Sequence, residues 1–136
     1  MGVALLLVTT NSLACVGLTV DHGWVREPPP GAAVAAAFMT LRNSGASPIT
    51  ITAVSSRRFA HAMIHQSMIV DGTARMVAHE TLVVAPHNSI QLAPAGLHLM
   101  LMQPNMPLAQ GQQVQIEFDC GGHRSTVALP IQRDLP

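Results

Sequence analysis

Short segments in which apolar residues recur at every second position, separated by turns of proline, glycine and asparagine, run through most of the sequence. In the segment 49–54, Ile-Thr-Ile-Thr-Ala-Val, this period of two is typical of a β-strand with one buried face. Comparable segments follow at intervals of about ten residues. They cover residues 18–25, 33–43, 49–54, 61–69, 74–84, 89–92, 97–102, 114–118 and 125–131. We therefore expect an all-β sandwich or barrel of about eight short strands.

A chain of 136 residues has room for one such domain. Its first residues are mostly apolar and lead to Ser12-Leu13-Ala14, which is typical of a secretory signal that is cleaved after a small residue. We expect a signal segment at 1–14 and one domain at 15–136. Two other interpretations stay open: a lipoprotein signal that ends in an acylated Cys15, and a buried N-terminal segment of a cytosolic protein.

The sequence holds two cysteines, Cys15 and Cys120. In an oxidising compartment they could form a disulfide that ties the first strand to the penultimate one. They could also stay apart, above all if Cys15 is acylated or removed. Two cysteines alone do not decide between these outcomes.

Charged side chains are few and balanced, because seven arginines stand against seven acidic residues and there is no lysine. This composition argues against nucleic-acid binding, which needs a basic surface. The sequence also lacks the metalloprotease pair His-Glu-x-x-His, the nucleophile turn Gly-x-Ser-x-Gly and a phosphate-binding loop. We therefore expect a binding protein and not an enzyme.

Histidine and methionine are frequent, with seven and eight residues, and both types bind soft or borderline metals. In the segment 97–102, Leu-His-Leu-Met-Leu-Met, leucines alternate with His98, Met100 and Met102. Because the leucines should face the core, these three side chains should share the opposite face of the strand. His98 and Met100 are therefore one pair of candidate metal ligands.

A hairpin supplies a second pair of candidate ligands. If Asp71-Gly72 forms its tip, His65 lies opposite Ala78, and Met76 is two residues from Ala78 on the same face. A thioether in this diagonal position can reach the imidazole of His65. Two imidazoles and two thioethers form a neutral ligand set that favours copper(I) over zinc, calcium or magnesium.

The spacing of these four residues, His65-x10-Met76-x21-His98-x-Met100, resembles the motif of the periplasmic copper chaperones called PCu(A)C. The likeness covers residues 18–131. The resemblance implies a cupredoxin-like Greek-key fold and one copper(I) ion held by the two histidines and two methionines.

The resemblance also implies a function outside the cytoplasm. PCu(A)C proteins carry copper(I) to a partner, usually the copper A centre in subunit II of cytochrome c oxidase, sometimes together with a Sco-type thioredoxin-like protein. We therefore expect a periplasmic, monomeric copper chaperone that takes part in oxidase assembly. The chain departs from the family at Met63, where an acidic residue is common, and at Ala95, where a second glycine is common.

Other methionines and histidines could contribute to the same site. By alternation His61 and Met63 continue the face of His65, and they could form a second soft site or an exposed strand face without ligands. Met68 and Met106, like Met102, could instead line the mouth of the copper site or pack in the ordinary way. The remaining histidines are expected to be surface residues; they are His22, His79, His87 and His123.

Two alternative functions remain open from the sequence. One is electron transfer by a cupredoxin-type blue-copper site, for which Cys120 and His123 would be the candidate ligands. However, Gly121-Gly122 between them is typical of a hairpin turn, and no methionine follows as an axial ligand. The other alternative is a metal-free β-sandwich that binds other proteins.

Overall fold

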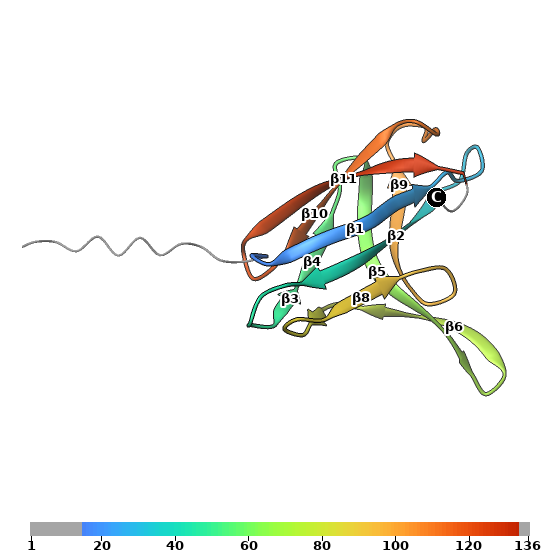
Figure 1. Ribbon diagram of the computed structural model, residues 1–136. Coiled ribbons are helices and arrows are strands. Elements are labelled where there is room, and N and C mark those ends of the chain that lie inside the picture. The colour runs from blue at the N-terminus through green and yellow to red at the C-terminus, as the bar shows by residue number, and fades with distance from the viewer. Residues whose placement is uncertain (1–14, 134–136) are drawn as a thin grey trace, which may run out of the picture.

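β-Strands make up most of residues 15–133, which are the residues that the computed structural model describes (Figure 1). The predicted signal segment 1–14 lies outside the described residues, as do residues 134–136. Within the described part of the chain, no helix is long and apolar enough to cross a membrane. The strands are β1 (Leu18–Arg26), β2 (Val34–Asn43), β3 (Ile49–Ile51), β4 (Ala53–Ser55), β5 (Phe59–Val70), β6 (Thr73–His79), β7 (Leu82–Val84), β8 (Ser89–Leu92), β9 (Leu97–Pro104), β10 (Gln113–Asp119) and β11 (Arg124–Gln132).

Nine of the strands form one sheet with the order β4-β10-β11-β1-β2-β9-β5-β6, to which β8 adds by pairing with β2. This sheet folds over on itself into two layers (Figure 1), and β4 at one end of the order contacts β5 near the other end. Strands β3 and β7 form a small second sheet. Hydrogen-bonded neighbours are antiparallel except for β1 and β11, which are parallel. The predicted all-β sandwich or barrel is confirmed.

The core lies between the layers and is built by alternation along the strands. On β9 the side chains of Leu99 and Leu101 are fully buried, and on β10 so are those of Val114 and Ile116. Burying apolar surface in this way is the main force that holds such a fold together. It also decides which side chains face outward, because neighbouring residues of a strand point to opposite faces.

Two of the nine segments that were expected to be strands are each divided in the structure, which gives eleven strands where about eight were predicted. The segment 49–54 breaks at Thr52, whose backbone N–H donates a hydrogen bond to the carbonyl of Asp119. On one side of this corner β3 pairs with β7, and on the other side β4 pairs with β10. The segment 74–84 divides in the same way into β6 and β7, because these strands belong to different sheets.

A disulfide joins Cys15, just before β1, to Cys120, just after β10, with 5.5 Å between the two Cα atoms. It therefore ties the segment before β1 to the turn after β10 across a sequence separation of 105. Of the two outcomes that the sequence left open, the structure has the one in which the cysteines form a disulfide.

Replacing both cysteines with serine should lower the free energy of unfolding by about 2–4 kcal/mol, because the disulfide restricts the unfolded chain over a long loop. Urea denaturation followed by circular dichroism measures the difference. Reducing the disulfide of the unmodified protein should lower the midpoint by a similar amount, whereas the same reductant should leave the doubly substituted protein unchanged. Equal midpoints for the unmodified and the doubly substituted protein, both measured without reductant, would contradict a stabilising role for the bond.

Candidate metal site

The pairing of β5 with β9 brings histidine and methionine side chains together on one face of the sheet. His65 lies directly opposite His98, Met63 lies opposite Met100, and His61 lies opposite Met102. Directly opposite residues of an antiparallel pair share a face. We call this set the His/Met face; its members are His61, Met63, His65, His98, Met100 and Met102.

Met76 reaches the same face from the third strand, β6. In the hairpin of β5 and β6, His65 pairs with Ala78 and Ser67 pairs with Met76, so Met76 is the diagonal neighbour of His65. This is the register predicted from the Asp71-Gly72 turn. The hairpin projects from the body of the protein (Figure 1), and the Met76 side chain is 52% exposed. The structure thus brings His65, Met76, His98 and Met100 into one neighbourhood.

Buried residues on the reverse face fix this arrangement. Ile64 of β5 pairs with Leu99 of β9, and these two side chains are 4% and 0% exposed. Leu101, two residues further along β9, is also fully buried. Because the apolar residues occupy the core face, His65, His98 and Met100 must occupy the other face.

His98 is held in one orientation and one tautomer. Its ring is almost buried, and Nδ1 lies 3.0 Å from the carbonyl oxygen of Gly96. A carbonyl only accepts hydrogen bonds, so Nδ1 carries the proton and Nε2 keeps its lone pair. A histidine that ligates a metal commonly donates its second ring nitrogen to a backbone carbonyl in this way. The preceding turn places Ala95 at φ +67°, in the left-handed region that glycine adopts more readily.

The surroundings of His65 favour its neutral imidazole form. Burial lowers the pKa of His65, and the nearby His98 lowers this pKa further. Its Nδ1 atom is buried and has no hydrogen-bond partner. The rings of His65 and His98 meet edge to face, with 6.0 Å between their centroids. An unpaired buried nitrogen costs free energy unless something binds it, and the neutral form is the one that ligates metals.

The donor set of this neighbourhood suits a soft metal. Within residues 15–133, no group of three or more histidine, cysteine, aspartate and glutamate side chains comes together as a metal site. Any site on the His/Met face therefore needs thioether ligands. Thioether sulfur and neutral imidazole are suitable ligands for copper(I), whereas calcium and magnesium prefer oxygen.

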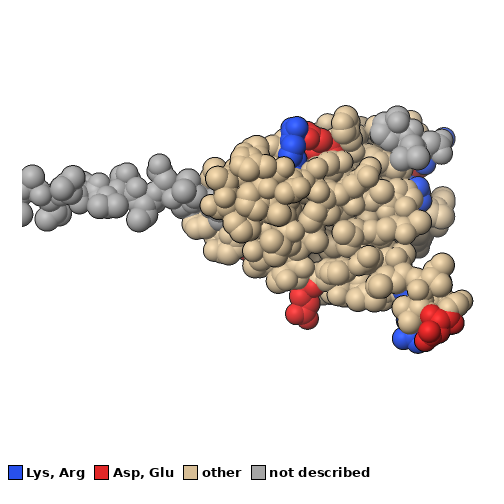
Figure 2. Space-filling model, turned by 60° about the horizontal axis from the view of Figure 1, so that its bottom comes forward, with Lys and Arg blue, Asp and Glu red and all other residues tan. Residues whose placement is uncertain are grey.

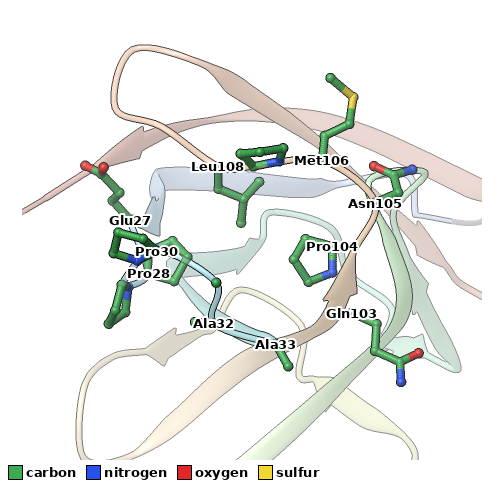
Figure 3. Close-up of a pocket in the computed structure, with 13 residues that line it drawn as sticks. Glu27, Pro28, Pro30, Ala32, Ala33, Gln103, Pro104, Asn105, Met106 and Leu108 are labelled. Carbon is green, nitrogen blue, oxygen red and sulfur yellow. The ribbon is translucent and has the colours of Figure 1, made fainter.

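Other candidate residues lie elsewhere. Met68 pairs with Arg75, so by alternation it faces away from His65. Met106 lines a pocket of about 680 Å³ between residues 27–33 and 103–108, whose lining side chains include five prolines and no histidine (Figure 3). The suggestion that Met68 shields the site is therefore wrong, and Met106 belongs to this other pocket.

The blue-copper alternative lacks its thiolate. The sulfur of Cys120 is bonded to that of Cys15. Gly121 and Gly122 form the predicted turn, with φ values of +76° and +92°, between β10 and β11. A blue-copper site needs a free cysteine thiolate as a ligand, so the structure argues against one at this position.

Sequence reasoning did not identify two features of the site. The carbonyl of Gly96, which orients His98, has no side-chain signature in the sequence. The pairing of Met63 with Met100 and of His61 with Met102 joins strands that no tight turn connects. The only signal for this pairing was that histidine and methionine occupy every second position in both segments. The segments are His-x-Met-x-His at 61–65 and His-x-Met-x-Met at 98–102.

Comparisons with known proteins place the chain in a family. The family model described as "Putative lipoprotein LpqE-like" matches residues 18–131. The curated "Putative lipoprotein Lxx21020" of Leifsonia xyli subsp. xyli (strain CTCB07) is 28% identical over 118 residues, which are 85% of this chain and 70% of that protein.

Solved structures share the fold. The structure described as "Copper-bound PCuAC domain from PmoF2" is 18% identical with a TM-score of 0.71, and the match covers 87% of this chain and 94% of that one. "Apo-DR1885 from Deinococcus radiodurans" is 27% identical with a TM-score of 0.67, over 88% and 80% of the two chains. "CuI-DR1885" from the same organism is 24% identical with a TM-score of 0.71, over 93% and 85%.

These matches confirm the expected cupredoxin-like fold and the expected likeness to PCu(A)C proteins. The chain belongs to the LpqE-like family and has the fold of a PCuAC domain.

Proposed function

We propose that this protein is an extracytoplasmic copper(I) chaperone that binds one cuprous ion through His65, Met76, His98 and Met100. The observation that carries the proposal is the strand register, which sets His65 opposite His98 and Met76 diagonal to His65. This register supports a site in which two imidazoles and two thioethers share one face of the sheet near its edge. Copper is the cargo of the protein.

The chemistry of the ligands supports copper(I). A d¹⁰ cuprous ion accepts neutral sulfur and nitrogen ligands in a tetrahedral arrangement, whereas zinc sites use thiolate, imidazole and carboxylate. Solved structures of the same fold are described as copper-bound and as CuI-bound, and this supports the same metal here. The ring orientation of His98 and the unpaired Nδ1 of His65 are what such a site requires.

The exposure of the ligands supports delivery. His98 is 6% exposed, while Met76 is half exposed on the projecting hairpin. An acceptor can therefore approach from the side of Met76 and replace its thioether first. The two histidines would keep hold of the ion until a second acceptor ligand binds. Such stepwise ligand replacement transfers copper without release into water.

The surface favours an acceptor protein that docks without strong electrostatic attraction. On the face in Figure 2, charged side chains are few and scattered among uncharged residues. Electrostatic steering of the acceptor is then weak. Exposed apolar residues of the hairpin, including Ile69 and Val77, offer contact area beside Met76. Resemblance to PCu(A)C proteins indicates the copper A centre of cytochrome c oxidase as the acceptor, directly or through a Sco-type protein.

The disulfide supports a location outside the cytoplasm. Disulfides persist in oxidising compartments such as the periplasm and the cell surface, and Cys15 is bonded to Cys120. The curated relative is named as a lipoprotein, which agrees with export. The site holds ligands but no paired acid and base, so we propose a carrier and not an enzyme.

An anaerobic titration with copper(I) against a chromophoric chelator tests the site. The protein should bind one tight equivalent, and His98→Ala/Met100→Leu should raise the Kd by at least about 100-fold, since changes just outside a ligand shell already cost 10–100-fold. The matched control is His79→Ala/Met68→Leu, which makes the same changes on the opposite face of β5 and β6. Its Kd should equal that of the unmodified protein. Equal affinities for all three proteins would contradict the proposed site.

Transfer kinetics test the chaperone role. When the copper-loaded protein is mixed with the copper-free soluble domain of oxidase subunit II, the observed rate should increase in proportion to the acceptor concentration, because transfer occurs within a complex. Anaerobic stopped-flow absorbance in the ultraviolet, where copper(I) bound to the acceptor's thiolates absorbs, measures this rate. A rate that is independent of acceptor concentration would indicate release into solvent and would contradict direct delivery.

Optical spectra separate the chaperone from an electron carrier. Copper-loaded protein should show no intense visible absorption in either the reduced or the oxidised state. Cys15→Ser/Cys120→Ser should still bind copper(I) at the proposed site, because neither sulfur is a ligand there. A blue-copper protein would show intense visible absorption when oxidised and would lose it in the Cys120→Ser variant. Observation of that behaviour would favour the electron-transfer alternative, and no stoichiometric metal at all would favour the interaction module.

A further inference from the structure

The His/Met face extends beyond the four proposed ligands. Past the pair of His65 and His98, the ladder of β5 and β9 continues with Met63 opposite Met100 and then His61 opposite Met102. Three successive rungs on one face therefore consist only of imidazoles and thioethers. Of these three rungs, the pair of His61 and Met102 lies farthest from the hairpin tip.

Spacing along the ladder allows His61, Met63 and Met102 to meet at one ion. Directly opposite Cβ atoms in an antiparallel pair are about 4.5–5.5 Å apart. Same-face neighbours along one strand are about 7 Å apart. Methionine has three rotatable side-chain bonds, so two thioethers can turn toward the imidazole of His61 from these positions.

A surface hollow joins the same three residues. His61, Met63 and Met102 all line it, together with Phe59 and residues 54–56 of the β4 region. None of the residues that line the hollow is acidic. His61 is exposed, Met63 is 37% exposed and Met102 is half-buried, so an ion can enter from solvent. The donors are again neutral and soft, which excludes the metals that need oxygen ligands.

We propose that His61, Met63 and Met102 form a second copper(I) site, weaker than the first. One imidazole and two thioethers give a three-coordinate cuprous ion without any net ligand charge. The affinity is lower because the site has one ligand fewer and is more exposed. This inference deepens the proposed function, on which it rests for the choice of metal.

The middle rung connects the two sites. Met63 belongs to the second site, and its cross-strand partner Met100 belongs to the first. Copper can therefore pass along the ladder by exchange of thioethers between neighbouring rungs, with no change of oxidation state. The second site would receive copper or release it at a point separate from Met76.

Silver(I), a redox-inert ion with the same d¹⁰ configuration, tests the inference. The full chain is labelled with ¹³C-methyl methionine and titrated with silver(I), with free methionine added to suppress binding at isolated thioethers. Native mass spectrometry should show two bound ions. The first equivalent should shift the methyl signals of Met76 and Met100, and the second should shift those of Met63 and Met102.

Variants separate the two sites. His61→Ala/Met102→Leu should keep the first equivalent and raise the Kd of the second by at least about tenfold. His79→Ala/Met68→Leu, on the opposite face of the same hairpin, should keep both. A second equivalent that is absent from the unmodified protein, or is unaffected in His61→Ala/Met102→Leu, would overturn the second site and leave the first intact. Absence of the first equivalent, with its shifts at Met76 and Met100, would count against the proposed function instead.

Discussion

The antiparallel pairing of β5 with β9 is the interaction on which the candidate metal site depends. A slip of one residue would move every histidine and methionine of one strand to the core face. Ile64 and Leu99 oppose such a slip, because it would expose these buried side chains to water and bury polar ones in their place. The apolar core therefore determines the geometry of the polar face. This explains how a site built on three strands, none of which needs a bound metal to pair, can be ready before copper arrives.

The sequence predicted those parts of the structure that depend on local signals. Alternation assigned most strands, and the Asp71-Gly72 turn gave the correct pairing of His65 with Ala78. The corner at Thr52 was missed because a strand that changes sheets keeps its alternation. The partners His98 and Met100 were grouped with His65 by the resemblance to a family motif, since no local rule predicts the register of strands that are distant in sequence. Whether these residues ligate copper remains a prediction.

The cysteines and the methionines of this protein have different roles. Cysteine sulfur forms a cross-link between the segment before β1 and the turn after β10, at Cys15 and Cys120. Methionine sulfur stays available on the His/Met face. In an oxidising compartment a thiolate ligand would itself be exposed to oxidation to a disulfide, whereas a thioether cannot form one. A carrier of copper(I) in such a compartment can therefore rely on methionine and histidine.

In the proposed site, the position of Met76 would separate the affinity for copper from the rate at which copper leaves. Strand β6 is the last strand of the sheet order, so it is paired on one side only, and strand edges of this kind open at a lower free-energy cost than the core. His98 lies on β9, which is paired on both sides, by β2 and β5. If copper binds at the proposed site, its equilibrium affinity would depend chiefly on the central strands, and its dissociation rate on local opening of the edge hairpin. A substitution at the hairpin tip could thus change the lifetime of the loaded state while the fold and the buried ligands stay as they are.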